Sequence, residues 1–106
     1  MATFEEFKKL ELKVGRVLEV ERVEGSEKLL KLKVDLGEPE PRQILAGVGK
    51  IYQPEEMVGR EIIVVANLEP RMLMGLESQG MLLAANDNGP VLLKPDKEVP
   101  PGSVIS

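Results

Sequence analysis

The residue types that carry most enzyme chemistry are missing from this sequence. It contains no histidine and no cysteine, which removes the commonest general base, the thiolate nucleophile and nearly every zinc site. Ser26 and Lys28 could form a serine–lysine pair in principle, but both fall in a polar turn and are interpreted as turn residues. Asp87 lacks the spaced carboxylates of a calcium loop. The sequence therefore predicts a non-catalytic protein with no metal and no cofactor.

The chemistry that remains is phosphate binding by scattered cations. Lys31 and Lys33 project from one face of a predicted strand, and Lys28 comes just before it. Arg42 and Arg71 would fall on or beside the same face if the strands close into a small barrel. Lysine and arginine are the residues that contact phosphate. Such strand lysines are often only solvated, however, and neighbouring glutamates would weaken the field.

The stretch from Asn67 to Met81 is the second unusual feature. It lies between the apolar runs 62–66 and 82–85 and holds three of the five methionines beside Arg71. We interpret it as a binding loop held between two rigid strands. The alternative is a connection whose methionines fill gaps at one end of the core.

Hydrophobic patterning predicts the elements that position these residues. Five strands are expected, over residues 12–23, 30–36, 42–47, 61–66 and 82–85. A capping box at Thr3 predicts a short helix over residues 4–10, and Pro54–Met57 is typical of one helical turn. An Asn-Gly signal at residues 86–89 predicts a hairpin turn.

This order predicts an all-β fold: a five-stranded Greek-key barrel of the oligonucleotide/oligosaccharide-binding type (OB-fold). A short N-terminal helix, a one-turn helix between strands 3 and 4 and a C-terminal hairpin extension complete it. In such barrels strands 2 and 3 and the loops between strands 1 and 2 and between 4 and 5 carry the ligand. The lysine strand and the methionine-bearing loop should therefore share one face. We expect residues 1–106 to form a single domain.

Composition limits the partners. The net charge is −4, from 14 basic and 18 acidic residues, so any contact with nucleic acid must be confined to a local cluster of cations. Two phenylalanines and one tyrosine argue against an aromatic platform for stacked bases. No apolar run is long enough for a membrane span and no signal peptide is recognisable. We therefore expect a cytoplasmic protein without membrane contact.

Five segments carry a family resemblance: residues 7–17, 27–35, 54–59, 65–71 and, most specifically, Gly75-Leu-Glu-Ser-Gln-Gly-Met-Leu-Leu-Ala84. Together they resemble the tRNA-binding domain found at the C-terminus of many bacterial methionyl-tRNA synthetases and as free-standing dimeric tRNA-binding proteins. The resemblance covers nearly the whole chain in the right order.

The resemblance implies tRNA as partner, bound by shape and backbone, a homodimer formed through elements flanking the barrel, and association with the catalytic domain of methionyl-tRNA synthetase. Carried over by position, the RNA-binding residues would be Lys28, Lys31, Lys33, Arg42, Asn67, Arg71, Ser78, Gln79, Gly80 and Met81. Glu69 and Met72 stand where relatives often have lysine, which would remove about one phosphate contact each.

Two alternatives stay open. The chain could be a dimerisation module with weak RNA affinity, which its low basicity allows. It could also be an export-related, peptide-binding chaperone of the same fold, because exposed methionines suit promiscuous apolar contacts.

Overall fold

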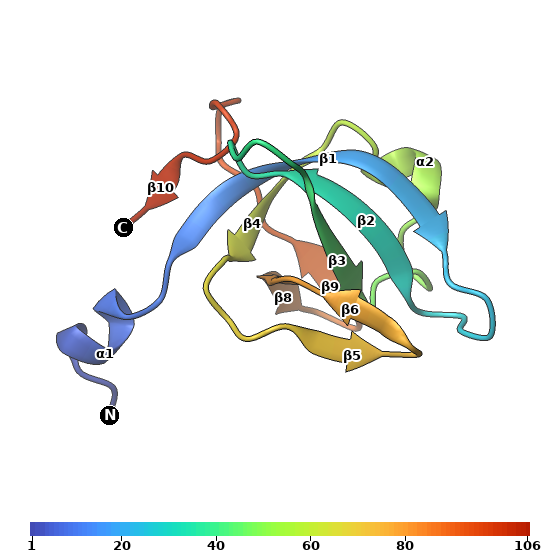
Figure 1. The fold of residues 1–106 in the computed structure, drawn as a ribbon, viewed down its shortest axis with the longest axis horizontal. Coiled ribbons are helices and arrows are strands. Elements are labelled where there is room, and N and C mark those ends of the chain that lie inside the picture. The colour runs from blue at the N-terminus through green and yellow to red at the C-terminus, as the bar shows by residue number, and fades with distance from the viewer.

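The computed structural model describes residues 1–106, which form a nearly closed OB-like barrel with short elements at its ends (Figure 1). The barrel strands neighbour one another in the order β3, β2, β1, β4 and β7. Their bounds are β1 Leu12–Arg22, β2 Leu30–Asp35, β3 Arg42–Ala46, β4 Glu61–Val65 and β7 Met81–Leu82. Two short helices, α1 Phe4–Lys8 and α2 Pro54–Met57, and the strand β10 Val104–Ile105 lie outside this order. Two hairpins complete the fold: β5 Arg71–Leu73 pairs with β6 Leu76–Ser78, and β8 Ala84–Asn86 pairs with β9 Pro90–Leu92. The predicted all-β, OB-type fold with two small helices is confirmed.

The core follows the sequence patterns directly. Along β2 the apolar side chains Leu30, Leu32 and Val34 are buried, while the alternating Lys31 and Lys33 face outward. Strand β4 is buried along its whole length, as expected for a run without alternation. These strands supply much of a single cluster of 12 buried residues. Burial of each such leucine or isoleucine contributes about 1.5–3 kcal/mol.

Strand β1 spans the barrel because its two halves pair with different strands. Residues 12–16 pair with β4 and residues 16–22 with β2, with an irregularity between Val17 and Glu19. The register shift falls at Leu18, and Gly15 has a packing role, because a Cβ there would lie 2.5 Å from Val34 Cγ1.

The region after β4 differs from the predicted loop and fifth strand. Residues 71–78 form the β5–β6 hairpin, whose two turn residues, Met74 and Gly75, have positive φ angles of 52° and 77°, as in a type I′ turn. The predicted strand 82–85 is divided: β7 pairs with β4, and β8 leaves the barrel to pair with β9. Strands of two or three residues are too short to show a period, so the sequence pattern could not reveal these breaks.

The barrel closes where residues 78–79 lie beside β3, and side-chain hydrogen bonds make most of the contact. Gln79 N donates to Gln43 O at 2.7 Å, and Gln43 N donates to Gln79 Oε1 at 2.9 Å. Next to them, Leu45 N donates to Ser78 Oγ at 3.0 Å. We call this set, Gln43, Leu45, Ser78 and Gln79, the closing seam.

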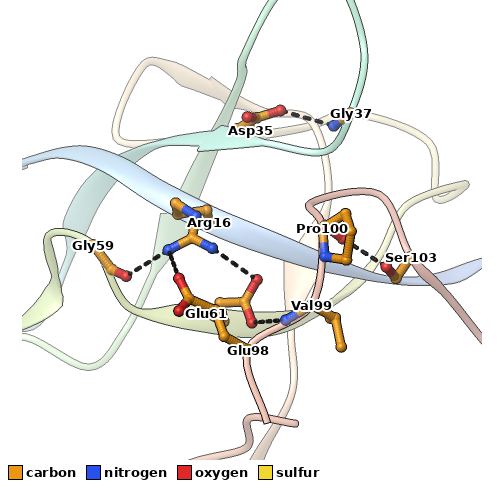
Figure 2. A network of polar contacts seen from close by, with 9 residues as sticks. All are labelled: Arg16, Asp35, Gly37, Gly59, Glu61, Glu98, Val99, Pro100 and Ser103. Carbon is orange, nitrogen blue, oxygen red and sulfur yellow. Dashed lines mark hydrogen bonds and ion pairs between the residues drawn. The ribbon is translucent and has the colours of Figure 1, made fainter.

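The C-terminal tail is tied to the barrel wall by the contacts shown in Figure 2. Glu61 is only 7% exposed and accepts hydrogen bonds from Val99 N at 2.9 Å and Arg16 Nη2 at 3.4 Å. Arg16 Nη1 also contacts Glu98 at 2.7 Å. The buried carboxylate is therefore paired and hydrogen-bonded, which a buried charge requires.

No helix in the structure has the length and apolar character to cross a membrane.

Candidate nucleic-acid interface

A groove of about 500 Å³ lies on the outer surface of the barrel, between the β1–β2 turn, the end of β3 and the β5–β6 hairpin. It is lined by Ser26, Lys28, Leu29, Leu45, Ala46, Gly47, Arg71, Leu73, Met74, Met81 and Leu82. We call it the β1–β2/β5–β6 groove. Leu29 and Leu45 belong to a small buried cluster with Val23, against which Leu73 and Leu76 of the hairpin pack. The hairpin is thereby anchored on the barrel, and the groove has a preformed apolar floor.

The β1–β2 turn fixes the backbone of Lys28 and leaves its amine free. Ser26 Oγ accepts a hydrogen bond from Leu29 N at 3.1 Å, which supports the interpretation of Ser26 as a turn residue. The carbonyl of Lys28 accepts from Gly49 N at 2.7 Å. The Lys28 side chain is exposed and forms no ion pair or hydrogen bond.

Arg71 is the second free cation of the groove. It lies in β5 opposite Ser78, is exposed, and forms no ion pair. It also lines a smaller adjoining hollow with Glu69 and Met81. No acidic residue lines the larger groove, so its two charged lining residues, Lys28 and Arg71, are both cations although the chain is acidic overall.

Lys31 and Lys33 lie on the same outer face but have partners. In the register of β2 and β3, Lys31 stands opposite Leu45 of the groove floor and Lys33 opposite Gln43. The Lys31 ammonium pairs with Glu21, and this hydrogen bond lowers the pKa of the Glu21 carboxyl. Lys33 Nζ donates to Gln43 Oε1 at 3.3 Å. The structure thus brings both lysines beside the groove, Lys31 paired with a carboxylate and Lys33 hydrogen-bonded to a neutral amide.

Arg42 is fully engaged within the protein. Its guanidinium donates from Nε and Nη2 to the two Glu38 oxygens, at 2.9 and 2.7 Å, and from Nη1 to the carbonyls of Ala66 and Gln79. The hydrogen bond with Glu38 raises the pKa of Arg42 and lowers that of Glu38. These bonds connect β3 to the end of β4 and to the segment before β7, and leave little capacity for a phosphate.

Asn67 lies outside the groove and joins the N-terminal segment to the barrel. Its Oδ1 accepts from Glu11 N at 2.8 Å, and its Nδ2 donates to Lys9 O at 2.6 Å. Both ends of the side-chain amide are therefore used to hold the connection between α1 and β1.

Ser78, Gln79 and Gly80 serve the closing seam and its packing. Ser78 is 5% exposed, and its hydroxyl donates to Gly80 O at 2.9 Å while accepting from Leu45 N. The side-chain oxygen of Gln79 accepts a hydrogen bond from Gln43 N. A Cβ on Gly80 would meet Ile44, Val64 and Val65 atoms at 3.3 Å, at a φ of 155°, so glycine permits this close approach.

The predicted site residues thus fall into three groups. Lys28, Arg71 and Met81 line the groove, and Lys31 and Lys33 lie beside it. The third group, whose members bond or pack within the protein while Asn67 and Gln79 stay exposed, is Arg42, Asn67, Ser78, Gln79 and Gly80. Apart from Met81, the apolar residues of the lining, Leu73 and Met74 among them, were not predicted as site residues. The one sequence signal for Met74 is the glycine that follows it. Gly75 favours positive φ, which both residues of a two-residue hairpin turn need, and Met74 is the other residue of that turn.

Residues 12–104 match the family described as "Putative tRNA binding domain". A methionine–tRNA ligase of Methanothrix thermoacetophila is 64% identical over 103 residues, which cover 96% of this chain and 15% of that protein. The methionine–tRNA ligase of Caldanaerobacter subterraneus is 56% identical over 105 residues, covering 98% of this chain and 16% of that protein. The chain therefore spans only about a sixth of the length of these relatives.

Solved structures of similar proteins cover the whole chain. The MetRS-related protein of Pyrococcus horikoshii has a TM-score of 0.91 at 40% identity, covering 100% of this chain and 98% of that one. The chaperone CsaA of Bacillus anthracis has a TM-score of 0.91 at 34% identity, with coverage of 100% and 99%.

Proposed function

The chain belongs to the tRNA-binding domain family, and on that premise we propose that it is a non-catalytic module that binds folded tRNA through the β1–β2/β5–β6 groove. One observation carries this assignment to the groove. Lys28 and Arg71 stand free of ion pairs in a groove without acidic lining, on a chain with a net charge of −4. Lysine and arginine side chains without an acidic partner are the groups that attract phosphate.

Recognition of shape and backbone suits this surface. No aromatic residue lines the groove, so a run of stacked single-stranded bases has no platform. Folded RNA is instead contacted through phosphates and 2′-hydroxyls. Lys31 and Lys33, beside the groove, would extend the contact once Glu21 and Gln43 release them.

Charge reversal in the groove tests the proposal. We expect Lys28→Glu with Arg71→Glu to abolish the binding of unfractionated tRNA in a fluorescence anisotropy titration at about 50 mM salt. The wild-type affinity should fall steeply with salt and depend little on the anticodon. Lys94→Glu with Lys97→Glu is the matched control, because both lysines are exposed and unpaired but lie outside the groove. Equal loss in both double variants would mean that total charge, not the groove, governs binding.

We propose that the module acts together with methionyl-tRNA synthetase in the cytoplasm. It would be either the C-terminal domain of the synthetase or a separate protein that binds it. The supporting observation is the high identity to part of several methionine–tRNA ligases. A tethered domain of modest affinity would hold tRNA near a catalytic domain through effective concentration.

We also propose that a second copy covers the end of the barrel that carries α1 and β10. Helix α1 has no buried residue, and Phe4, Phe7, Leu10 and Val104 are 70%, 45%, 44% and 75% exposed. They border an apolar hollow of about 440 Å³ that continues along β1 to β10. Apolar surface of this kind is typical of an interface between subunits, and β10 presents a free edge.

Sedimentation equilibrium tests the dimer. We expect Phe4→Ser with Phe7→Ser to give the monomer mass and the wild type twice that mass. Val58→Ser is the control, because Val58 is 52% exposed in another part of the surface. A wild type that stays monomeric at high concentration would exclude this interface.

The peptide-binding alternative is favoured by one observation, the apolar and methionine-bearing lining of the groove, together with the likeness to chaperone CsaA. A fluorescent apolar peptide that binds and is not displaced by tRNA would support a chaperone-like function. Displacement by tRNA would place both ligands in one groove.

A further inference from the structure

We propose that the β1–β2/β5–β6 groove receives a single unpaired nucleobase of a folded RNA, with the neighbouring phosphates held by Lys28 and Arg71. This inference rests on the proposed tRNA-binding function and specifies which part of the RNA enters the groove. It starts from the character of the groove, which is more apolar than a surface that contacts only phosphates and riboses.

The dimensions and lining of the groove favour one flat apolar group. Its volume of about 500 Å³ lies in the range of about 300–1,000 Å³ typical of small-molecule sites, and is too small for a nucleic-acid helix. The floor residues Leu29 and Leu45 are only 8% and 6% exposed. The apolar surface that an inserted base would cover is therefore supplied mainly by the exposed Met74 and Met81 side chains above this floor, and an RNA backbone alone would leave it without a partner.

Two methionines take the place of the missing aromatic residues. Met74 and Met81 line the groove from the β5–β6 turn and from β7, and they are 57% and 44% exposed. A thioether sulfur makes favourable contacts with aromatic rings, and the flexible methionine chain adapts to different ring sizes. The two side chains can therefore hold any base without reading its identity.

The conformation of Met74 supports a role at this position. Its φ of 52° is strained for a non-glycine residue. A Cβ placed on Gly25 would lie 3.4 Å from Met74 Cε, so Met74 reaches from the hairpin to the β1–β2 turn. Asparagine or glycine would form the same turn with less strain, and the side chain present instead covers one side of the groove.

The two free cations complete the match to a nucleotide. Lys28 comes from the β1–β2 turn and Arg71 from β5, so positive charge reaches the groove from both of its walls. A nucleotide inserted base-first carries a phosphate on each side of its ribose. The arrangement therefore matches an unpaired nucleotide within a longer chain better than a free base.

Model RNAs test the inference by fluorescence anisotropy. Three RNAs with one duplex length are compared: a blunt duplex, a duplex with a single-nucleotide bulge, and a duplex with a short 3′ overhang. We expect the bulge or the overhang to bind roughly three- to tenfold more tightly than the blunt duplex, given the modest strength of sulfur–ring contacts. The better of the two identifies the source of the nucleotide as a loop or a chain end. An abasic site at the preferred position should return the affinity to that of the blunt duplex.

Methionine variants make the test specific to the groove. Met74→Gly with Met81→Ala should remove the preference for the unpaired nucleotide; glycine suits the positive φ at position 74, so the hairpin should persist. Met72→Ala is the matched control, because Met72 is 64% exposed on the same hairpin and does not line the groove. Equal affinity for the bulged and abasic RNAs, or an unchanged preference in the double variant, would overturn the inference. If tRNA binds but shows no such dependence, only this inference fails; absence of tRNA binding would overturn the proposed function itself.

Discussion

Replacing Ser78 with alanine separates a structural role of this residue from direct RNA contact. The family resemblance assigns Ser78 to the RNA-binding face, whereas its hydroxyl is buried and bonded on both sides, to Leu45 N and Gly80 O. Ser78→Ala would leave the Leu45 N–H and the Gly80 carbonyl without these partners. No other side chain contacts the Leu45 N–H.

The magnitude follows from the burial of these groups. A buried donor left unsatisfied costs about 1–3 kcal/mol, and we expect a loss of about 2 kcal/mol in the free energy of unfolding. For a domain of this size each kcal/mol corresponds to about 4–8 °C. The Tm of Ser78→Ala should therefore fall by roughly 8–16 °C, measured by circular dichroism. Glu77→Ala is the control, because Glu77 is exposed in the same strand and its side chain has no partner.

The affinity of the folded variant completes the test. At about 10 °C, where both proteins remain folded, tRNA affinity of Ser78→Ala should stay within about twofold of wild type. An unchanged Tm together with lost tRNA binding would refute this reasoning and assign the hydroxyl to the RNA.

Two further predictions concern stability. Because the hydrogen bond from Arg42 lowers the pKa of Glu38 below its ordinary value of 4.5, the stability that this pair contributes is present above that value and is lost as the pH falls through the lowered pKa. In urea unfolding, the free energy of unfolding should fall less between pH 7 and pH 3 for Glu38→Gln than for wild type. Glu40 has no ion pair, so Glu40→Gln should lose as much stability as wild type. An identical loss in all three proteins would contradict the role of the pair. Met74→Asn should raise the Tm by about 4–8 °C, because the positive φ of 52° costs a non-glycine, non-asparagine residue about 1 kcal/mol; a lower Tm would show that contacts of the methionine side chain outweigh the strain.

Strong periodicity made most of the barrel predictable from the sequence. The alternation around Leu32 and the unbroken apolar run of β4 both determined which side chains are buried. The capping box of Thr3 and Glu6 forms as predicted, with Glu6 N donating to Thr3 Oγ1 at 3.1 Å. Each of these features depends on contacts within a few residues or on one repeating pattern, so the sequence displays them directly.

Contacts between distant segments could not be predicted in the same way. Nothing near Ser78 in sequence reveals that its hydroxyl serves Leu45, 33 residues away, or that Asn67 bridges to Lys9 and Glu11. A set of positions assigned to a binding face by resemblance therefore includes residues whose side chains are bonded within the protein. These bonds separate Ser78 and Asn67 from Lys28, Arg71 and Met81, which line one groove.

The closing seam also has a consequence for motion. One backbone hydrogen bond, from Gln79 N to Gln43 O, joins residues 78–79 to β3. The other bonds there are made by side chains, so the two segments lack the continuous backbone ladder of paired strands. Local fluctuations should therefore start there, and the amides of Gln43 and Leu45 should exchange with deuterated water sooner than those of β2. Since the same segment carries the β5–β6 hairpin, a ligand seated against that hairpin would slow exchange at both amides without touching either.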